Sequence, residues 1–315
     1  MHATSLVPYW TARRVLYKNR SSGQSQDYLA LWKYRRMHVS TGIAYRPEDN
    51  PFTVVMVDVT HRCNMACRNC YIPARDIPDM DAAWLQSVLV RLPRRARIRL
   101  VGAEPTVRRD LASLVRMVRA SGHLPQLLSN GLALANRAYV ARLKKAGLRT
   151  VYLSMNGGLR DDLYEAMDDL ACAKRKLAAL ENLGAEHMYA SVGMTLAFGV
   201  NSGHVGEFWR YLVQRPQVRE VHLRSVGPLG RHMAGAAYTL EDLIAIAREQ
   251  IGLSAAQVEA GVREPHVLDM FVGRVQLHLT QWPDLGSQTR GRLTPDGKIE
   301  PFFEHVTLNA ANGGY

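Results

Sequence analysis

The sequence predicts an α/β fold, a partial (β/α)6 barrel of the TIM type, and three observations support this prediction. Runs of β-branched, apolar residues of strand length alternate with helical patterns from residue 52 to about residue 226. Polar turns follow these strands, at the strand ends where parallel α/β sheets place their ligand sites. The chain has 315 residues, of which 47% are hydrophobic, so it can bury a large core. A doubly wound parallel sheet is the alternative architecture.

The first half of the predicted barrel follows a basic segment, residues 1–50, which we interpret as an N-terminal appendage. The apolar run 52–59 is the first expected strand, and it ends in a polar loop that contains three cysteines. The next expected elements are a helix at 79–90, a strand at 98–101, a helix near 110–120, a strand at 126–129, a helix at 136–146 and a strand at 150–154.

The second half of the predicted barrel begins with a long helical stretch near 160–183. Strands are expected at 188–198 and 218–226, with a helix at 205–213 between them. After residue 238 the alternation stops, and we expect helices at 239–252 and 255–263 and short strands and turns at 275–305. Residues 51–235 are therefore expected to form the core barrel, and residues 236–315 a C-terminal α+β extension that caps it.

Composition and charge restrict the class of protein. No run of roughly 18 apolar residues is present and the N-terminal residues lack the apolar core of a signal peptide, so we expect a cytoplasmic protein without a membrane partner. The net charge is +12, and basic residues gather at 13–36 and 91–99. Such segments favour anionic partners, including an anionic substrate. A solvated basic surface is the simpler alternative, and nucleic acid is the less favoured partner.

The strongest chemical signal is the group Cys63, Cys67 and Cys70, in a C-x3-C-x2-C spacing after the first expected strand. Three thiolates this close together can bind one [4Fe–4S] cluster and leave one iron open to another ligand. The alternatives are a zinc site, a four-cysteine cluster completed by Cys172, and chance clustering. Zinc would require further ligands at suitable spacing, and the eleven histidines show none.

Taken in order, the motifs resemble the radical S-adenosylmethionine (SAM) superfamily, in the branch of molybdenum-cofactor and peptide-modifying enzymes. The resemblance covers about residues 52–232. The family's Gly-Gly-Glu-Pro motif corresponds to Gly102-Ala103-Glu104-Pro105, with alanine at the second glycine. Asn69 stands where the family often has an aromatic residue. The resemblance implies a [4Fe–4S] cluster and SAM as cofactors, and cleavage of SAM to a 5′-deoxyadenosyl radical that abstracts hydrogen from a substrate.

The resemblance also implies a set of SAM contacts at successive strand ends. The expected residues are Gly102, Ala103, Glu104 and Pro105 after the second strand, Ser129 and Asn130 after the third, Ser154 and Asn156 after the fourth, and Met194, Asn201 and Arg224 on or after the fifth and sixth. Within this set, the carboxylate of Glu104 is expected to bind the SAM ammonium group. Tyr71 is a candidate for the aromatic cover of the cluster or the adenine. Serine and asparagine at strand ends are also common turn formers.

Candidates for contact with the substrate are less specific. Cys172, in the long helical stretch, is a candidate hydrogen donor, although a lone helical cysteine is more often a small buried apolar residue. The segment 276–305 is expected to close the barrel mouth or to form an ordinary surface cap. Its polar and aromatic residues are Gln276, His278, Gln281, Trp282, Asp284, Gln288, Arg290, Arg292, Glu304 and His305.

The expected function is radical SAM chemistry with a single cluster, since no cysteine follows Cys172. An external reductant such as flavodoxin or ferredoxin is an expected partner. A small metabolite of a biosynthetic pathway is the expected substrate. The alternatives are a peptide or RNA substrate, and, in another class, a non-enzymatic iron–sulfur or zinc protein.

Overall fold

The computed structural model describes residues 43–68, 70, 72, 75–93, 95–197, 199–225, 239–264, 266–281 and 290–301. Most of the predicted appendage, the basic segment 13–36, Asn69 and Tyr71 lie outside the described residues. The same holds for residues 282–289 and 302–315, and so for several polar candidates of the C-terminal segment.

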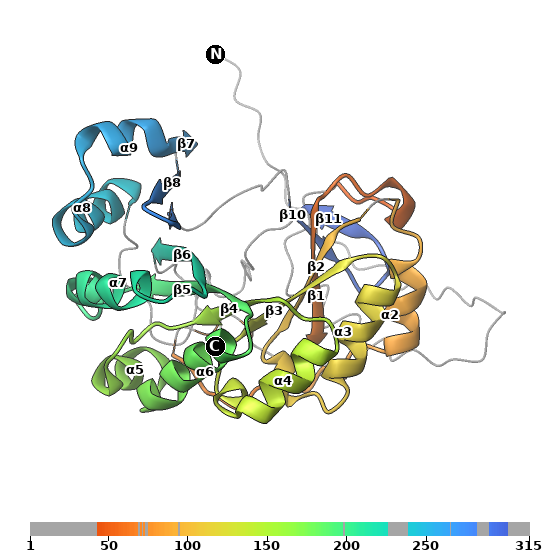
Figure 1. Ribbon diagram of the computed structural model, residues 1–315. Coiled ribbons are helices and arrows are strands. Elements are labelled where there is room, and N and C mark those ends of the chain that lie inside the picture. The colour runs from red at the N-terminus through yellow and green to blue at the C-terminus, as the bar shows by residue number, and fades with distance from the viewer. Residues whose placement is uncertain are drawn as a thin grey trace, which may run out of the picture.

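A single sheet is the framework of the described fold (Figure 1), with the strand order β11-β10-β1-β2-β3-β4-β5-β6-β9-β8-β7. All neighbouring pairs from β10 to β9 in this order are parallel. The strands are β1 (Val54–Thr60), β2 (Arg97–Gly102), β3 (Leu124–Ser129), β4 (Thr150–Ser154), β5 (Tyr189–Leu196), β6 (Val218–Ser225), β7 (Val262–Glu264), β8 (Val267–Val272), β9 (Val275–Thr280), β10 (Arg290–Leu293) and β11 (Ile299–Pro301).

Helices connect successive parallel strands and lie along the outer side of the curved sheet (Figure 1). The α-helices are α2 (Ala82–Leu89), α3 (Leu111–Ala120), α4 (Arg137–Lys145), α5 (Asp161–Asp168), α6 (Ala173–Ala185), α7 (Val205–Val213), α8 (Leu240–Ile251) and α9 (Ala255–Gly261). Short 3-10 helices are η1 (Pro47–Asp49), η2 (Pro105–Val107), η3 (Ala133–Ala135) and η4 (Ser202–His204). This arrangement confirms the predicted α/β class with a partial TIM-like barrel.

The two faces of the sheet differ in polarity because side chains alternate along each strand. On one face, residues such as Val55, Val57 and Ile98 are buried in the core between the sheet and the helices. The other face forms the barrel interior, where Met56 on β1 is the cross-strand neighbour of Arg99 on β2. The barrel interior therefore combines a small apolar cluster, which includes Met56, with polar side chains such as Arg99, which donates to Gln126 at 2.8 Å.

The prediction of one long helical stretch near 160–183 is wrong in one respect, because the structure divides this segment into two helices, α5 and α6. Asp169 takes a left-handed conformation with φ of 57°, and this ends α5. Helix α6 then begins after Cys172, which is the N-cap residue. Cys172 consequently lies at a helix start and not inside a helix as predicted.

The described C-terminal residues extend the barrel sheet at both edges. Strand β9 pairs in parallel with β6, and β10 pairs in parallel with β1. Strand β8, which was not predicted, pairs antiparallel with β9. This part of the chain thus contributes to the barrel wall, while the predicted domain boundaries and the capping role stay predictions. None of the described helices is long and apolar enough to cross a membrane.

Candidate active site

The cysteine loop follows β1 at the carboxyl edge of the sheet, where parallel α/β folds bind ligands. Cys63, Cys67 and Cys70 are all partly exposed and have free thiols. The loop is compact: the Cys70 N–H donates to the Cys67 carbonyl at 3.3 Å, and the Met65 N–H donates to the Cys63 sulfur at 3.4 Å. Three accessible thiols on one short loop are a suitable donor set for an iron–sulfur cluster with one iron left open.

An arginine side chain and a cavity lie beside the cysteine loop. Nη2 of Arg75 lies 3.0 Å from the Cys70 sulfur, whereas its Nη1 is buried without a hydrogen-bond partner in the described part of the chain. Burial raises the pKa of the Cys63 and Cys67 thiols, so binding iron there must displace protons. A cavity of about 470 Å³ adjoins the loop, and this volume is typical of small-ligand sites. Its lining residues are Arg62, Cys63, Met65, Ala66, Arg75 and Val107.

The end of β2 is joined tightly to the end of β1. Gly102 has φ of 121°, and a Cβ there would lie 2.1 Å from the Thr60 carbonyl oxygen, so the close approach requires glycine. The Ala103 N–H donates to the Thr60 carbonyl at 2.9 Å, and the Glu104 N–H donates to the Arg62 carbonyl at 3.0 Å. The Gly102–Pro105 motif therefore lies directly beside the start of the cysteine loop.

Glu104 organises this edge of the sheet. Its Oε1 accepts hydrogen bonds from Thr106 N at 3.0 Å, Thr106 Oγ1 at 2.6 Å and Ser129 Oγ at 2.9 Å, and its Oε2 accepts from Asn130 N at 2.6 Å. The residue is 0% exposed, and burial raises the pKa of its carboxyl group. The direct contact of Glu104 with a SAM ammonium group stays a prediction. In this structure the carboxylate is buried and positions the loops after β2 and β3.

Asn130 extends this network to the cysteine loop. Its Nδ2 donates to Asn64 Oδ1 at 2.8 Å and lies 3.9 Å from the Cys63 sulfur. Its Oδ1 accepts from the Leu132 N–H at 3.0 Å. A continuous set of hydrogen bonds therefore runs from Glu104 through Asn130 to Asn64, next to the first cysteine.

We expect Glu104→Gln to weaken SAM binding about 10- to 100-fold. The amide N–H group of the new glutamine would face a hydrogen-bond donor and so distort the loops after β2 and β3. The measurement is a SAM titration of the reduced, reconstituted protein, followed by the electron paramagnetic resonance signal of the cluster. Thr106→Ser keeps the hydroxyl group and is the matched control. Unchanged SAM affinity in Glu104→Gln would contradict the organising role of this residue.

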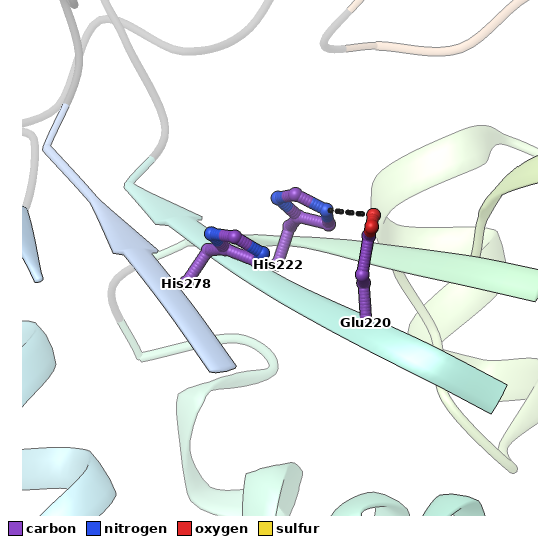
Figure 2. A group of neighbouring side chains, drawn as sticks. All are labelled: Glu220, His222 and His278. Atoms are coloured by element: carbon purple, nitrogen blue, oxygen red, sulfur yellow. Dashed lines mark hydrogen bonds and ion pairs between the residues drawn. The ribbon is translucent and has the colours of Figure 1, made fainter. Parts of the chain in front are cut away.

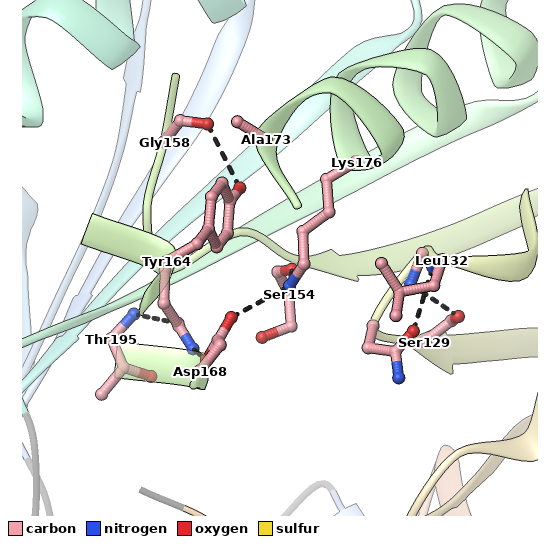
Figure 3. Close-up of polar contacts among 12 residues, drawn as sticks. Ser129, Leu132, Ser154, Gly158, Tyr164, Asp168, Ala173, Lys176 and Thr195 are labelled. Carbon is pink, nitrogen blue, oxygen red and sulfur yellow. Dashed lines mark hydrogen bonds and ion pairs between the residues drawn. The ribbon is translucent and has the colours of Figure 1, made fainter. Parts of the chain in front are cut away.

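A second network lies at the end of β4, and Figure 3 labels Thr195, Asp168 and Ser154, which belong to it. Asn156 is buried; its Oδ1 accepts from the Thr195 N–H at 3.0 Å and its Nδ2 donates to Asp168 at 2.9 Å. Asn201 is also buried, and its Nδ2 donates to the carbonyls of Asn156 and Thr195, both at 2.8 Å. The structure thus brings two predicted site residues together, but as buried supports of the strand ends.

Lys176 and Asp168 form a buried ion pair near the end of β4 that was not predicted from the sequence. Lys176 Nζ lies 3.1 Å from Asp168 Oδ2, and each side chain is 2% exposed. The same Nζ donates to the Ser154 carbonyl at 2.8 Å and lies 4.8 Å from the centre of the Tyr164 ring (Figure 3). This buried ion pair fixes the backbone of Ser154, which was a predicted site residue.

The two remaining residues expected to contact SAM, Met194 and Arg224, lie apart from the Gly102–Pro105 motif. Met194 is 1% exposed and packs in the core between the sheet and the helices, facing away from the barrel interior. Arg224 lies on β6, where it is the cross-strand neighbour of Thr280 on β9. The structure therefore groups Ser129 and Asn130 with the Gly102–Pro105 motif, whereas Met194 does not belong to the same site.

Cys172 is buried next to the cysteine loop. It packs with Leu132, Tyr164 and Ala173, and Met65 of the cysteine loop contacts this cluster. Burial raises the pKa of the Cys172 thiol to about 11, so the thiol keeps its proton at neutral pH. The described surroundings are those of a small buried apolar residue.

Cys172→Ala is expected to leave the iron and sulfide content unchanged and to cost about 1 kcal/mol of stability, through a small cavity. Iron analysis and denaturant unfolding measure these two quantities. Loss of iron in Cys172→Ala would favour the four-cysteine cluster instead.

A polar group on the barrel wall joins His278, a predicted candidate for substrate contact, with Glu220 and His222, which were not predicted. Glu220 and His222 on β6 and His278 on β9 bring their ligand atoms within 4.8 Å of one another (Figure 2). The hydrogen bond to His222 lowers the pKa of Glu220 to about 2, and burial lowers the pKa of His222 to about 3. Glu220 is therefore ionised and His222 neutral at pH 7. Only the spacing of Glu220 and His222 on one strand could have signalled this group.

The family follows from the cysteine loop, the strand-end motifs and the barrel together. The model of the radical SAM superfamily matches residues 57–212. The chain belongs to the radical SAM superfamily, and the family implies a [4Fe–4S] cluster and SAM as cofactors. The predicted family, enzyme class and cofactors are thereby confirmed.

Among curated proteins, the chain is similar to 7,8-dihydro-6-hydroxymethylpterin dimethyltransferase of Methanocaldococcus jannaschii, with 32% identity over 273 residues. This alignment covers 80% of the chain and 53% of the relative. A GTP 3′,8-cyclase of Geobacter sulfurreducens is 30% identical over 171 residues, which are 51% of each chain. A GTP 3′,8-cyclase of Heliobacterium modesticaldum is 27% identical over 78% of this chain and 79% of its own. The chain thus spans about half the length of the first two relatives.

Solved structures show the same fold. Streptococcus suis SuiB bound to precursor peptide SuiA superposes with a TM-score of 0.60 at 12% identity, over 95% of this chain and 69% of that chain. Native anSMEcpe with bound AdoMet and Cp18Cys peptide gives a TM-score of 0.53 at 14% identity, over 64% and 59% of the two chains. At this identity the likeness extends to the fold alone.

Proposed function

We propose that Cys63, Cys67 and Cys70 hold a [4Fe–4S] cluster and that this chain cleaves SAM reductively to begin a radical reaction on a small metabolite. The observation that carries the proposal is the hydrogen-bond network from Glu104 through Asn130 to the cysteine loop. It places the Gly102–Pro105 motif and the three thiols at one edge of the sheet. When bound, the cluster and SAM supply one-electron cleavage of a carbon–sulfur bond, which gives methionine and a 5′-deoxyadenosyl radical.

The chain's own residues have distinct tasks in this proposal. The three thiolates bind iron, and Arg75 places a positive charge beside the Cys70 sulfur. Backbone groups of Gly102 and Ala103, which are partly exposed, are available to bind SAM beside the loop. Asn156, Asn201 and the other buried polar residues hold the strand ends in position. The electron comes from an external reductant, such as flavodoxin or ferredoxin.

Two observations support a small and anionic substrate. The relatives whose names specify a substrate act on a pterin and on GTP. Inside the barrel, burial and repulsion from Arg290 lower the pKa of Arg99 to about 10, so this arginine is cationic at pH 7. Positive charge in a partly buried polar interior favours an anionic ligand.

The substrate class is tested by offering pterins, purine nucleotides and short peptides to the reduced, reconstituted protein with SAM. We expect a pterin or a nucleotide to increase the rate of 5′-deoxyadenosine formation, with transfer of substrate deuterium into that product. Stimulation by peptides alone would contradict the small-metabolite proposal while leaving the radical SAM activity intact.

A further inference from the structure

A second group of metal-ligating side chains lies on the barrel wall (Figure 2). Glu220 and His222 are two residues apart on β6 and so face the same side of the sheet. His278 on β9 is the cross-strand neighbour of His222, and the two rings stack with centroids 4.2 Å apart and planes 4° from parallel, so one ring must tilt out of the stack for both to bind one ion. Arg290, whose charge acts on His278, is the cross-strand neighbour of Val54 at the start of β1, whereas the cysteine loop follows Thr60 at the end of β1. The group is therefore distinct from the proposed cluster site.

The spacing of Glu220 and His222 suits a shared ion. Glu220 Oε2 lies 3.4 Å from His222 Nε2, at the long end of the hydrogen-bond range. Two ligand atoms that are each about 2.1 Å from one ion are roughly 3.0 to 3.4 Å apart. The same nitrogen also contacts Ser191 Oγ at 2.9 Å, and an ion would replace this contact.

His278 has a carboxylate near one ring nitrogen and, among the described residues, no partner at the other. Its Nδ1 lies 3.5 Å from Asp269 Oδ1, and Gln276 fixes that carboxylate by donating to the same oxygen at 2.8 Å. Nε2 of His278 is buried and has no hydrogen-bond partner within the described ranges. A carboxylate at one ring nitrogen, with the other nitrogen left for the ion, is the usual arrangement at metal sites.

We propose that Glu220, His222 and His278 bind one divalent transition-metal ion, of the zinc or ferrous class. Two imidazoles and one carboxylate suit such ions, whereas Mg²⁺ and Ca²⁺ prefer oxygen ligands alone. All three side chains are partly exposed, so the ion keeps open positions toward the barrel interior. Arg224 and Arg290 repel positive charge at His278, and the carboxylates of Glu220 and Asp269 offset this repulsion. The site does not depend on the proposed function.

The test is equilibrium dialysis of the reconstituted protein against zinc chloride under anaerobic conditions, with zinc and iron counted in the same sample. Because the cluster occupies the three cysteines, we expect one zinc per chain at the barrel-wall site. His278→Gln and Glu220→Gln should weaken zinc binding about 100-fold or more, and Asp269→Asn about 10-fold. His204→Gln is the matched control, since this partly exposed histidine lies 3.8 Å from Glu207.

Equal zinc binding by the unmodified protein, His278→Gln and Glu220→Gln would overturn the proposal, as would an absence of zinc binding in the unmodified protein. Unchanged iron content and far-ultraviolet circular dichroism establish that the variants fold. If the cysteines bind zinc instead of a cluster, Cys63→Ala loses that zinc and His278→Gln does not. Failure of the cluster assignment and failure of the barrel-wall site are therefore distinguishable.

Discussion

Replacement of Cys63, Cys67 or Cys70 by alanine is expected to abolish 5′-deoxyadenosine formation and to remove most of the bound iron and sulfide. With three thiolates, one iron of the cube lacks a protein ligand; with two, a second iron is exposed and the cluster becomes labile. Chromatography of the SAM products measures the loss of 5′-deoxyadenosine formation, and iron and sulfide analysis after anaerobic reconstitution measures the loss of the cluster.

The control for these variants is Cys172→Ala, which removes a thiol that is buried outside the cysteine loop. Its cluster content and activity should equal those of the unmodified protein. A Cys67→Ala variant that keeps its full iron content and cleaves SAM would show that the three cysteines do not hold the cluster.

Lys176→Met is expected to lower the free energy of unfolding by about 3 to 5 kcal/mol. The substitution leaves the Asp168 carboxylate buried at 2% exposure without its cation. It also removes the hydrogen bond from Nζ to the Ser154 carbonyl. Denaturant unfolding, with the midpoint and slope fitted separately, measures the loss.

Arg137→Met is the matched control, because Arg137 forms a 2.8 Å ion pair with Glu186 while its own side chain is 63% exposed. Loss of this exposed pair should cost at most about 1 kcal/mol. The double variant Lys176→Met with Asp168→Asn should regain part of the stability, since it removes the buried charge. An equal loss in Lys176→Met and Arg137→Met would contradict the structural role of the buried pair.

The barrel could be predicted from the sequence because each strand carries its own signal. Residues 150–154, for example, are predicted and observed as the same strand. The division between α5 and α6 was not predicted, because it depends on the left-handed conformation of Asp169, and aspartate favours helix ends and turns without marking any one position as a break. The burial of Lys176 against Asp168 therefore had no local signal either.

Only part of the candidate site could be predicted, because only part of it is formed by residues that are close together in the sequence. The cysteine loop and the Gly102–Pro105 motif are local in sequence, and the structure places them side by side. The burial of Glu104 depends on donors from Ser129 and Asn130, which belong to the next strand end. His222 and His278 meet only because β9 pairs with β6, and this pairing has no local signal after the β/α alternation ends.

The most direct test of the account is to add SAM and dithionite to the reconstituted protein and to quantify the products. The account predicts 5′-deoxyadenosine and methionine in equal amounts, formed by the unmodified protein and not by Cys63→Ala. Protein that carries a complete, reduced [4Fe–4S] cluster and forms no 5′-deoxyadenosine, with or without pterins and nucleotides present, would contradict it.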